Sequence, residues 1–136
     1  MNKLRLLLVD DNPRFLKAAR ELLAVLPCVE GVDCAASGEE ALAQAGRSQP
    51  DLVLTDLTMP GISGFEVIRR LRASESPPRI VALTLHEGVE YRAAAQRSGA
   101  SSFVAKHEFA ALIPALIASF AGNSDADESM LEALHA

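Results

Sequence analysis

The chain has 136 residues, of which 49% are apolar and 4% aromatic, and this fits one domain with a largely aliphatic core. Its formal net charge is −5, and residues 122–136, with four acidic residues and no Lys or Arg, carry −4 of it. The nearly neutral remainder has no electrostatic basis for binding nucleic acid or an anionic membrane surface directly.

Apolar, strand-like runs alternate with helical stretches along residues 4–120. The predicted strands are Leu4–Val9, Val32–Ala36, Leu52–Thr55, Ile80–Thr84 and Ser102–Ala105. The predicted helices are Pro13–Leu26, Glu39–Gly46, Phe65–Arg72, Val89–Ser98 and Ala110–Phe120. Five such alternations are typical of a doubly wound α/β fold, in which helices cover both faces of a parallel sheet.

Capping residues support these boundaries. Asn12-Pro13 fits an N-cap followed by proline at the first helical position, and Ser37 and Ser63 each precede a Glu by three residues, as in a capping box. Gly99 is placed to end the fourth helix in a left-handed conformation. Pro114 fits less well, because the fifth helix needs a backbone hydrogen bond near that position. That helix either begins late or bends at the proline.

Residues 122–136 differ in composition from the rest and are predicted to form an acidic tail or linker after a domain at residues 1–121. Cys28 and Cys34 suit reduced thiols, with a disulfide between them as the alternative. The first apolar run stops at Asp10, which is too early for a signal peptide, and no stretch reaches membrane-spanning length. We therefore expect a soluble, cytoplasmic protein.

Polar residues follow four of the predicted strands. Ligands of open parallel sheets bind at the carboxyl ends of the strands. Asp10 and Asp11 follow the first strand, Asp56 follows the third, Thr84 ends the fourth and Lys106 follows the fifth. We therefore expect three carboxylates, a hydroxyl and an amine to meet at one edge of the sheet.

Three carboxylates in one pocket repel one another unless a cation joins them. Oxygen ligands without His or Cys favour Mg²⁺ or Mn²⁺, and Mg²⁺ held by carboxylates commonly takes a phosphate as a further ligand. The simplest chemistry is attack by a carboxylate on phosphorus, which gives an aspartyl phosphate. Asp56 is the expected nucleophile because it stands alone, whereas Asp10 and Asp11 form a pair that suits a metal seat.

Four short motifs follow one another along the chain: Val-Asp-Asp at 9–11, Asp-Leu-Thr-Met-Pro-Gly at 56–61 with Gly64, Leu-Thr at 83–84, and Gly-Ala-Ser-Ser-Phe-Val-Ala-Lys at 99–106. Their order and spacing resemble the receiver domain of bacterial two-component response regulators. The resemblance spans residues 4 to about 120. It implies a flavodoxin-like fold with a five-stranded parallel sheet in the order 2-1-3-4-5.

The resemblance also implies roles for these residues. Asp56 accepts a phosphoryl group from a sensor histidine kinase in a Mg²⁺-dependent reaction. Asp11 binds the metal directly, Asp10 binds it mostly through water, and the carbonyl of Thr58 is a further ligand.

The remaining roles belong to a switch. Thr84 moves to hydrogen-bond the phosphoryl oxygen, Lys106 ion-pairs with it, and Phe103 swings inward with Thr84. Static core packing is the alternative explanation for Phe103. The surface of the fourth helix, fifth strand and fifth helix then changes state, and it is also a candidate surface for homodimerisation.

Two residues depart from the family pattern. Leu85 replaces the usual small residue after the switch threonine, and its bulk is expected to slow phosphorylation or hydrolysis. His107 replaces a proline that the family holds in a cis peptide, so we expect a trans bond or a distorted loop there. Transcription-factor receivers of the LuxR type often lack that proline, which favours that subfamily.

The predicted function is therefore a phosphorylation-controlled signalling domain, not an enzyme that turns over a metabolite. Its output is either DNA-binding transcription regulation by a domain outside this chain, which we favour, or direct contact with an effector protein. An aspartyl-phosphate phosphohydrolase is disfavoured because such enzymes need a second acid where this chain has Thr58. The complete acid pocket argues against an unphosphorylated scaffold.

Overall fold

The structure is a computed structural model that describes residues 3–85 and 88–122. It contains a five-stranded parallel sheet in the order β2-β1-β3-β4-β5, which confirms the predicted fold class and topology. The strands are β1 (Leu4–Val9), β2 (Val29–Ala35), β3 (Leu52–Asp56), β4 (Arg79–Thr84) and β5 (Ser102–Ala105). The helices are α1 (Pro13–Ala24), α2 (Gly38–Ser48), α3 (Gly64–Arg72), α4 (Val89–Ser98) and α5 (Phe109–Gly122), with a 3₁₀ turn, η1, at Lys106–Glu108.

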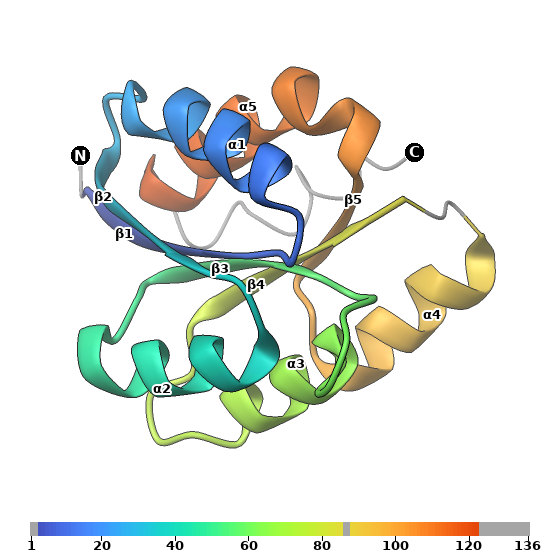
Figure 1. The fold of residues 1–136 in the computed structure, drawn as a ribbon. Helices are drawn as coiled ribbons and strands as arrows, with labels where there is room; N and C mark the ends of the chain where they lie inside the picture. The colour runs from blue at the N-terminus through green and yellow to red at the C-terminus, as the bar shows by residue number, and fades with distance from the viewer. Residues whose placement is uncertain (1–2, 86–87, 123–136) are drawn as a thin grey trace.

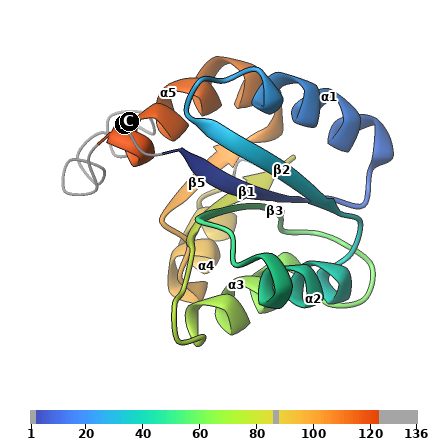
Figure 2. The ribbon, with the colours of Figure 1, turned by 90° about the vertical axis from the view of Figure 1, so that its left-hand side faces the viewer.

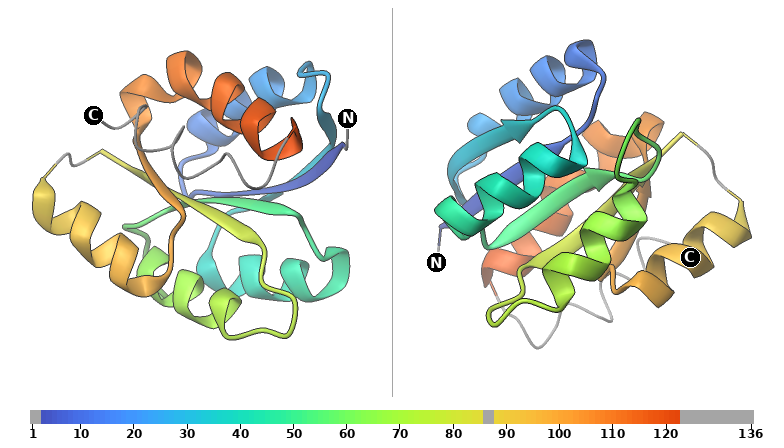
Figure 3. Two further views of the ribbon diagram at one scale, coloured as in Figure 1. Left: turned by 180° about the vertical axis from the view of Figure 1, so that it is seen from behind. Right: turned by 60° about the horizontal axis from the view of Figure 1, so that its bottom comes forward.

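Helices cover both faces of the sheet. Figure 1 shows α1 and α5 above the sheet and α2, α3 and α4 below it, and the turned view in Figure 2 keeps the same three layers. In Figure 3, seen from behind, α4 and α5 lie on opposite faces next to the edge strand β5. At the carboxyl ends of the strands, short connections lead from the sheet into the helices.

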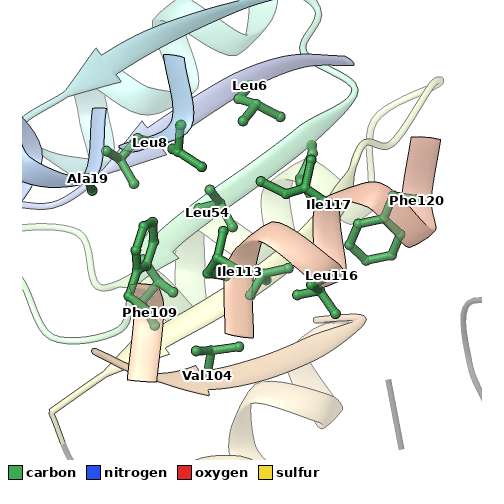
Figure 4. Packing of buried hydrophobic residues seen from close by; sticks show 14 of the residues in the cluster. Leu6, Leu8, Ala19, Leu54, Val104, Phe109, Ile113, Leu116, Ile117 and Phe120 are labelled. Atoms are coloured by element: carbon green, nitrogen blue, oxygen red, sulfur yellow. The ribbon is translucent and has the colours of Figure 1, made fainter. Parts of the chain in front are cut away.

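Two hydrophobic clusters hold the layers together, one on each face of the sheet. Along β1, Leu6 and Leu8 belong to the cluster under α1 and α5, whereas Leu7 and Val9 belong to the cluster over α2, α3 and α4. This alternation is the two-residue period of a strand that is buried on both faces. Figure 4 shows the first cluster, where residues of α5 pack onto β1, β3 and β5. Both faces of the central strands are therefore fixed by packing.

The predicted N-caps are confirmed, but the Glu half of each predicted capping box differs. The Asn12 side chain accepts hydrogen bonds from the first turn of α1, and Ser37 and Ser63 each accept one from the backbone N–H three residues later. The Glu40 carboxylate accepts from the backbone N–H of Ala36, and the Glu66 carboxylate accepts from Arg69 and Arg70. Gly99 ends α4 with a φ of 114°, a conformation that costs glycine little.

Several of the predicted element ends shift by one or two residues, and two differences from the sequence prediction need a physical explanation. Strand β2 begins at Val29, three residues before the predicted start, because its exposed Glu30 and Gly31 hide the apolar pattern at the edge of the sheet. Helix α5 begins at Phe109, so Pro114 lies inside it and the late start is excluded. The missing N–H would have bonded the carbonyl of Ala110, an exposed position that water can reach.

One sequence-based expectation, the acidic tail or linker, falls on residues 123–136, which lie outside the described residues. Within the described residues, Cys28 and Cys34 are both free. None of the helices in this part of the chain combines the length and hydropathy that crossing a membrane requires.

Candidate functional site

The register of the sheet brings the predicted site residues to one edge. Val9 of β1 pairs with Thr55 of β3, so Asp10 and Asp56, each one residue further along, lie side by side. Asp56 pairs in turn with Leu83 of β4, next to Thr84. Thr84 pairs with Ala105 of β5, and Lys106 follows directly. Four strand ends therefore converge at the same level, which the sequence order alone could not establish.

Three carboxylates and one ammonium meet at this edge. One carboxylate oxygen from each of Asp10, Asp11 and Asp56 lies within 4.8 Å of the other two. The Lys106 Nζ lies 2.6 Å from Oδ2 of Asp10 and 3.5 Å from Oδ2 of Asp56. Asp10 is fully buried, Asp56 is 5% exposed and Asp11 is exposed. The single ammonium offsets only one of three negative charges.

Asp10 combines burial with an unsatisfied oxygen. Its Oδ1 accepts a hydrogen bond from the backbone N–H of Asn12 at 2.9 Å. Its Oδ2 has the close ion pair with Lys106, but among the described residues no donor reaches that oxygen with hydrogen-bond geometry. A buried carboxylate oxygen in this state has capacity left for a cation.

The electrostatics of Asp56 reflect the same crowding. Burial raises the pKa of the Asp56 carboxyl above its ordinary value, and the neighbouring Asp10 carboxylate raises that pKa further. The Lys106 ammonium and a hydrogen bond from the backbone N–H of Thr58 act in the opposite direction. The pKa of Asp56 is raised overall because burial and the Asp10 carboxylate outweigh these two contacts. A cation beside Asp56 would therefore relieve repulsion as well as bind.

The loop after β3 holds Asp56 at the strand end. The backbone N–H of Gly64, the first residue of α3, donates to the carbonyl of Leu57 at 3.1 Å. A Cβ on Gly64 would lie 1.9 Å from the backbone oxygen of Asp56, so only glycine allows α3 to approach this closely. Met59 is buried in the cluster on this face, while Thr58 stays exposed. These contacts fix the loop directly after Asp56.

The residues assigned to the switch lie near the pocket. Thr84, at the end of β4, is 1% exposed, and Leu85 beside it is 75% exposed. Phe103 is 5% exposed and packs into the cluster over α2, α3 and α4, with the Arg92 guanidinium 5.6 Å from its ring centroid. The ring of Phe103 therefore occupies an inward position in this structure, and whether it moves stays a prediction.

Lys106 opens the 3₁₀ turn that connects β5 to α5. No peptide bond in the described residues is cis, so the bond before His107 is trans, as predicted for a chain without the family proline. The side chain of Lys106 also lies against Phe15 of α1, with Nζ 4.9 Å from the ring centroid. Phe15 could not be predicted from the sequence as a site residue, because an aromatic residue in the first turn of an amphipathic helix is typical of core packing.

Comparison with known proteins places this site in a family. The model of the response regulator receiver domain matches residues 6–117, which include all of the site residues discussed above. The chain belongs to that family. Receiver domains are signalling domains of two-component systems, as the sequence motifs predicted.

Individual relatives agree with this assignment. The nitrate/nitrite response regulator protein NarL of Escherichia coli (strain K12) is 32% identical over 132 residues, which cover 96% of this chain and 61% of NarL. The signal receiver domain of the putative response regulator NarL from Mycobacterium tuberculosis superposes with a TM-score of 0.83 at 28% identity, covering 90% of this chain and 100% of that chain. A two-component response regulator of the LuxR family from Aurantimonas sp. SI85-9A1 gives a TM-score of 0.81 at 30% identity, covering 98% of both chains.

The match to NarL of E. coli covers nearly all of this chain but less than two thirds of NarL. The likeness therefore concerns the receiver domain, and the activity of a whole response regulator does not transfer with it.

Proposed function

We propose that this receiver domain accepts a phosphoryl group on Asp56 from a sensor histidine kinase in a Mg²⁺-dependent reaction. The observation that carries the proposal is the position of the Asp56 carboxylate, which is buried beside Asp10 and Asp11 and faces the Lys106 ammonium at 3.5 Å. A carboxylate with this environment can be both a nucleophile and a ligand.

In the proposed step, a carboxylate oxygen of Asp56 attacks the phosphorus of a phosphohistidine. The new O–P bond forms as the P–N bond to the kinase imidazole breaks, and the electron pair of that bond stays on the imidazole nitrogen. The Lys106 ammonium then lies next to the oxygens of the new phosphoryl group, where it offsets their charge. The Thr84 hydroxyl is the expected hydrogen-bond donor to one of these oxygens.

The residues fit Mg²⁺ or Mn²⁺ as the metal. The three carboxylates of Asp10, Asp11 and Asp56 offer oxygen ligands within 4.8 Å of one another. Oδ2 of Asp10 is ion-paired with Lys106 at 2.6 Å but receives no well-oriented hydrogen bond from the described residues. We propose that Asp11, Asp56 and the Thr58 carbonyl hold the ion directly and Asp10 mostly through water. Such a metal, when bound, neutralises charge on the phosphoryl oxygens during transfer.

Phosphorylation would be transmitted to a surface. We propose that Thr84 and Phe103 bias the surface formed by α4, β5 and α5 toward a second conformation that already exists in equilibrium. This surface would then bind an output domain, an effector or a second copy of the chain.

The proposed output is DNA-binding transcription regulation in the cytoplasm by a domain outside this chain. Support comes from the relatives, because the chain covers 61% of NarL of E. coli, and from a structural neighbour that is a response regulator of the LuxR family. In this reading residues 1–121 are the receiver domain and residues 122–136 are its linker. The alternative is a stand-alone receiver that acts by protein contact.

Incubation with acetyl phosphate and Mg²⁺ tests the phosphoacceptor. We expect one phosphoryl group per chain by intact-mass measurement, and none in Asp56→Asn. The matched control is Asp51→Asn, which changes an exposed aspartate at the other end of the same strand and should leave phosphorylation unchanged. Equal incorporation in Asp56→Asn, or incorporation that does not depend on Mg²⁺, would contradict the proposal. Steady turnover of a phosphate ester would favour a phosphohydrolase instead.

A further inference from the structure

The ammonium of Lys106 has a third neighbour besides the two carboxylates. Its Nζ lies 4.9 Å from the centroid of the Phe15 ring, within the range of a cation–π contact. The Lys106 side chain is 10% exposed, so this contact is largely shielded from water. Such shielding strengthens a cation–π contact relative to an exposed one.

Phe15 is held in place from two sides. Its backbone N–H donates to the side chain of Asn12, the N-cap of α1, at 3.3 Å. Its ring packs edge-on against Phe109, with centroids 5.3 Å apart and an interplanar angle of 81°. Phe109 is buried at the start of α5, directly after the turn that Lys106 begins. Phe15 therefore contacts the first residue of the short turn, Lys106, and the residue that follows the turn, Phe109.

An aromatic face suits a lysine that must change partners. In the structure Nζ is closer to Asp10, at 2.6 Å, than to Asp56, at 3.5 Å. A phosphoryl group on Asp56 would add oxygen acceptors on that side of the ammonium. The ring attracts the charge without accepting a directional hydrogen bond, so the N–H groups remain available to oxygen acceptors.

We infer that Phe15 is a positioning residue for Lys106, holding its ammonium over the acid pocket so that it can pass from Asp10 to the phosphoryl oxygens. This inference rests on the proposed function. Phe15 itself touches neither the phosphoryl group nor the metal ligands in this role.

The experiment compares three variants by their affinity for beryllofluoride, a phosphoryl mimic, at saturating Mg²⁺. Phe15→Leu removes the ring but keeps an apolar side chain, and it should weaken binding about 3- to 10-fold, the range expected for loss of a cation–π contact. Phe15→Tyr keeps the ring and should bind as the wild type does.

The matched control is Phe120→Leu. Phe120 is buried in the same cluster and also carries a cation–π contact, with Arg79 at 4.8 Å, but it lies at the far end of α5 from Phe109 (Figure 4). Phe120→Leu should lower the melting temperature without changing beryllofluoride affinity. Phe15→Leu with wild-type affinity, or Phe15→Tyr as weak as Phe15→Leu, would overturn the inference.

A second measurement does not depend on phosphoryl chemistry. The ring of Phe15 should shift the NMR signals of the Lys106 ε-methylene protons upfield in the wild type and in Phe15→Tyr, and the shift should disappear in Phe15→Leu. If the wild type shows this shift but fails to bind beryllofluoride, the proposed function fails while the contact stands. If the wild type binds beryllofluoride without the shift, the positioning role fails alone.

Discussion

The two ends of the parallel sheet both carry aspartates, but they satisfy them differently. At the amino end, exposed Asp51 accepts a hydrogen bond from the backbone N–H of Arg5 at 2.8 Å on its Oδ2. Its own backbone donates to the Arg5 carbonyl at 2.8 Å and accepts from the Arg79 N–H at 3.0 Å. At the carboxyl end, Asp10 and Asp56 are buried, and one ammonium faces both of them.

This difference separates an aspartate that supports the fold from those that form a site. Asp51 lies at the start of β3, and its hydrogen bonds connect it to the starts of β1 and β4. Because its side chain is exposed, these hydrogen bonds stabilise the folded state without burying a charge. Asp10 and Asp56 place charge where burial and mutual repulsion oppose it, and the two hydrophobic clusters must hold them there. Removing the charge of Asp51 and of Asp56 should therefore change the free energy of unfolding in opposite directions.

The largest expected effect comes from breaking the carboxyl end itself. Gly64→Ala would place a Cβ 1.9 Å from the backbone oxygen of Asp56, so the start of α3 and the end of β3 have to separate. We expect a loss of about 3 kcal/mol or more in the free energy of unfolding. Phosphorylation by acetyl phosphate should fall as well, because the position of Asp56 changes. Urea denaturation and intact-mass measurement check the two effects.

A second glycine provides the control for that prediction. Gly46 is an exposed residue of α2, and a Cβ there would meet nothing within 4 Å. Gly46→Ala should therefore raise the free energy of unfolding by about 0.5 to 1 kcal/mol, because alanine restricts the unfolded chain and favours the helix. Similar effects of the two substitutions would mean that close approach at Gly64 does not matter.

The contrast between these glycines marks how far the sequence could lead. The alternation of apolar runs predicted the fold, since the strands β1, β3 and β4 are buried on both faces and read as nearly continuous apolar segments. The motifs predicted which residues meet at the carboxyl end, because strand order and register follow from the fold. They did not predict that Gly64 leaves no room for a Cβ against the backbone oxygen of Asp56, or that Phe15 contacts Lys106. Both depend on how a helix docks against a strand end, which no local pattern encodes.

An intermediate effect is expected from removing charge at each end. In metal-free buffer at pH 7, Asp56→Asn should be more stable than the wild type by on the order of 1 kcal/mol, because it removes a buried, repelled carboxylate. Asp51→Asn should instead lose about 0.5 kcal/mol, because a charge-assisted hydrogen bond becomes a neutral one. Urea denaturation of both variants measures the two signs.

The pH dependence sharpens this test. Because folding raises the pKa of Asp56, its protonated form favours the folded state, and that contribution is lost as the pH rises through the folded-state pKa. The gain from Asp56→Asn should therefore be small near pH 4 and grow toward pH 7. A gain that stays constant over this range would show that repulsion and burial of the charge are not its cause.

The smallest effect on stability, and the one most specific to the site, is expected at Leu85. This side chain is 75% exposed, so Leu85→Ala should change the free energy of unfolding by less than about 0.5 kcal/mol. Leu85 directly follows Thr84 at the end of β4, and we expect its apolar side chain to hinder the approach of water to a phosphorylated Asp56. We expect Leu85→Ala to speed loss of the phosphoryl group by a few-fold, measured by intact mass after removal of acetyl phosphate.

Val25, which is 79% exposed at the end of α1, gives the matched control: Val25→Ala should leave both stability and the dephosphorylation rate unchanged. An unchanged dephosphorylation rate in Leu85→Ala would show that Leu85 does not control hydrolysis and that the buried residues around Asp56 do.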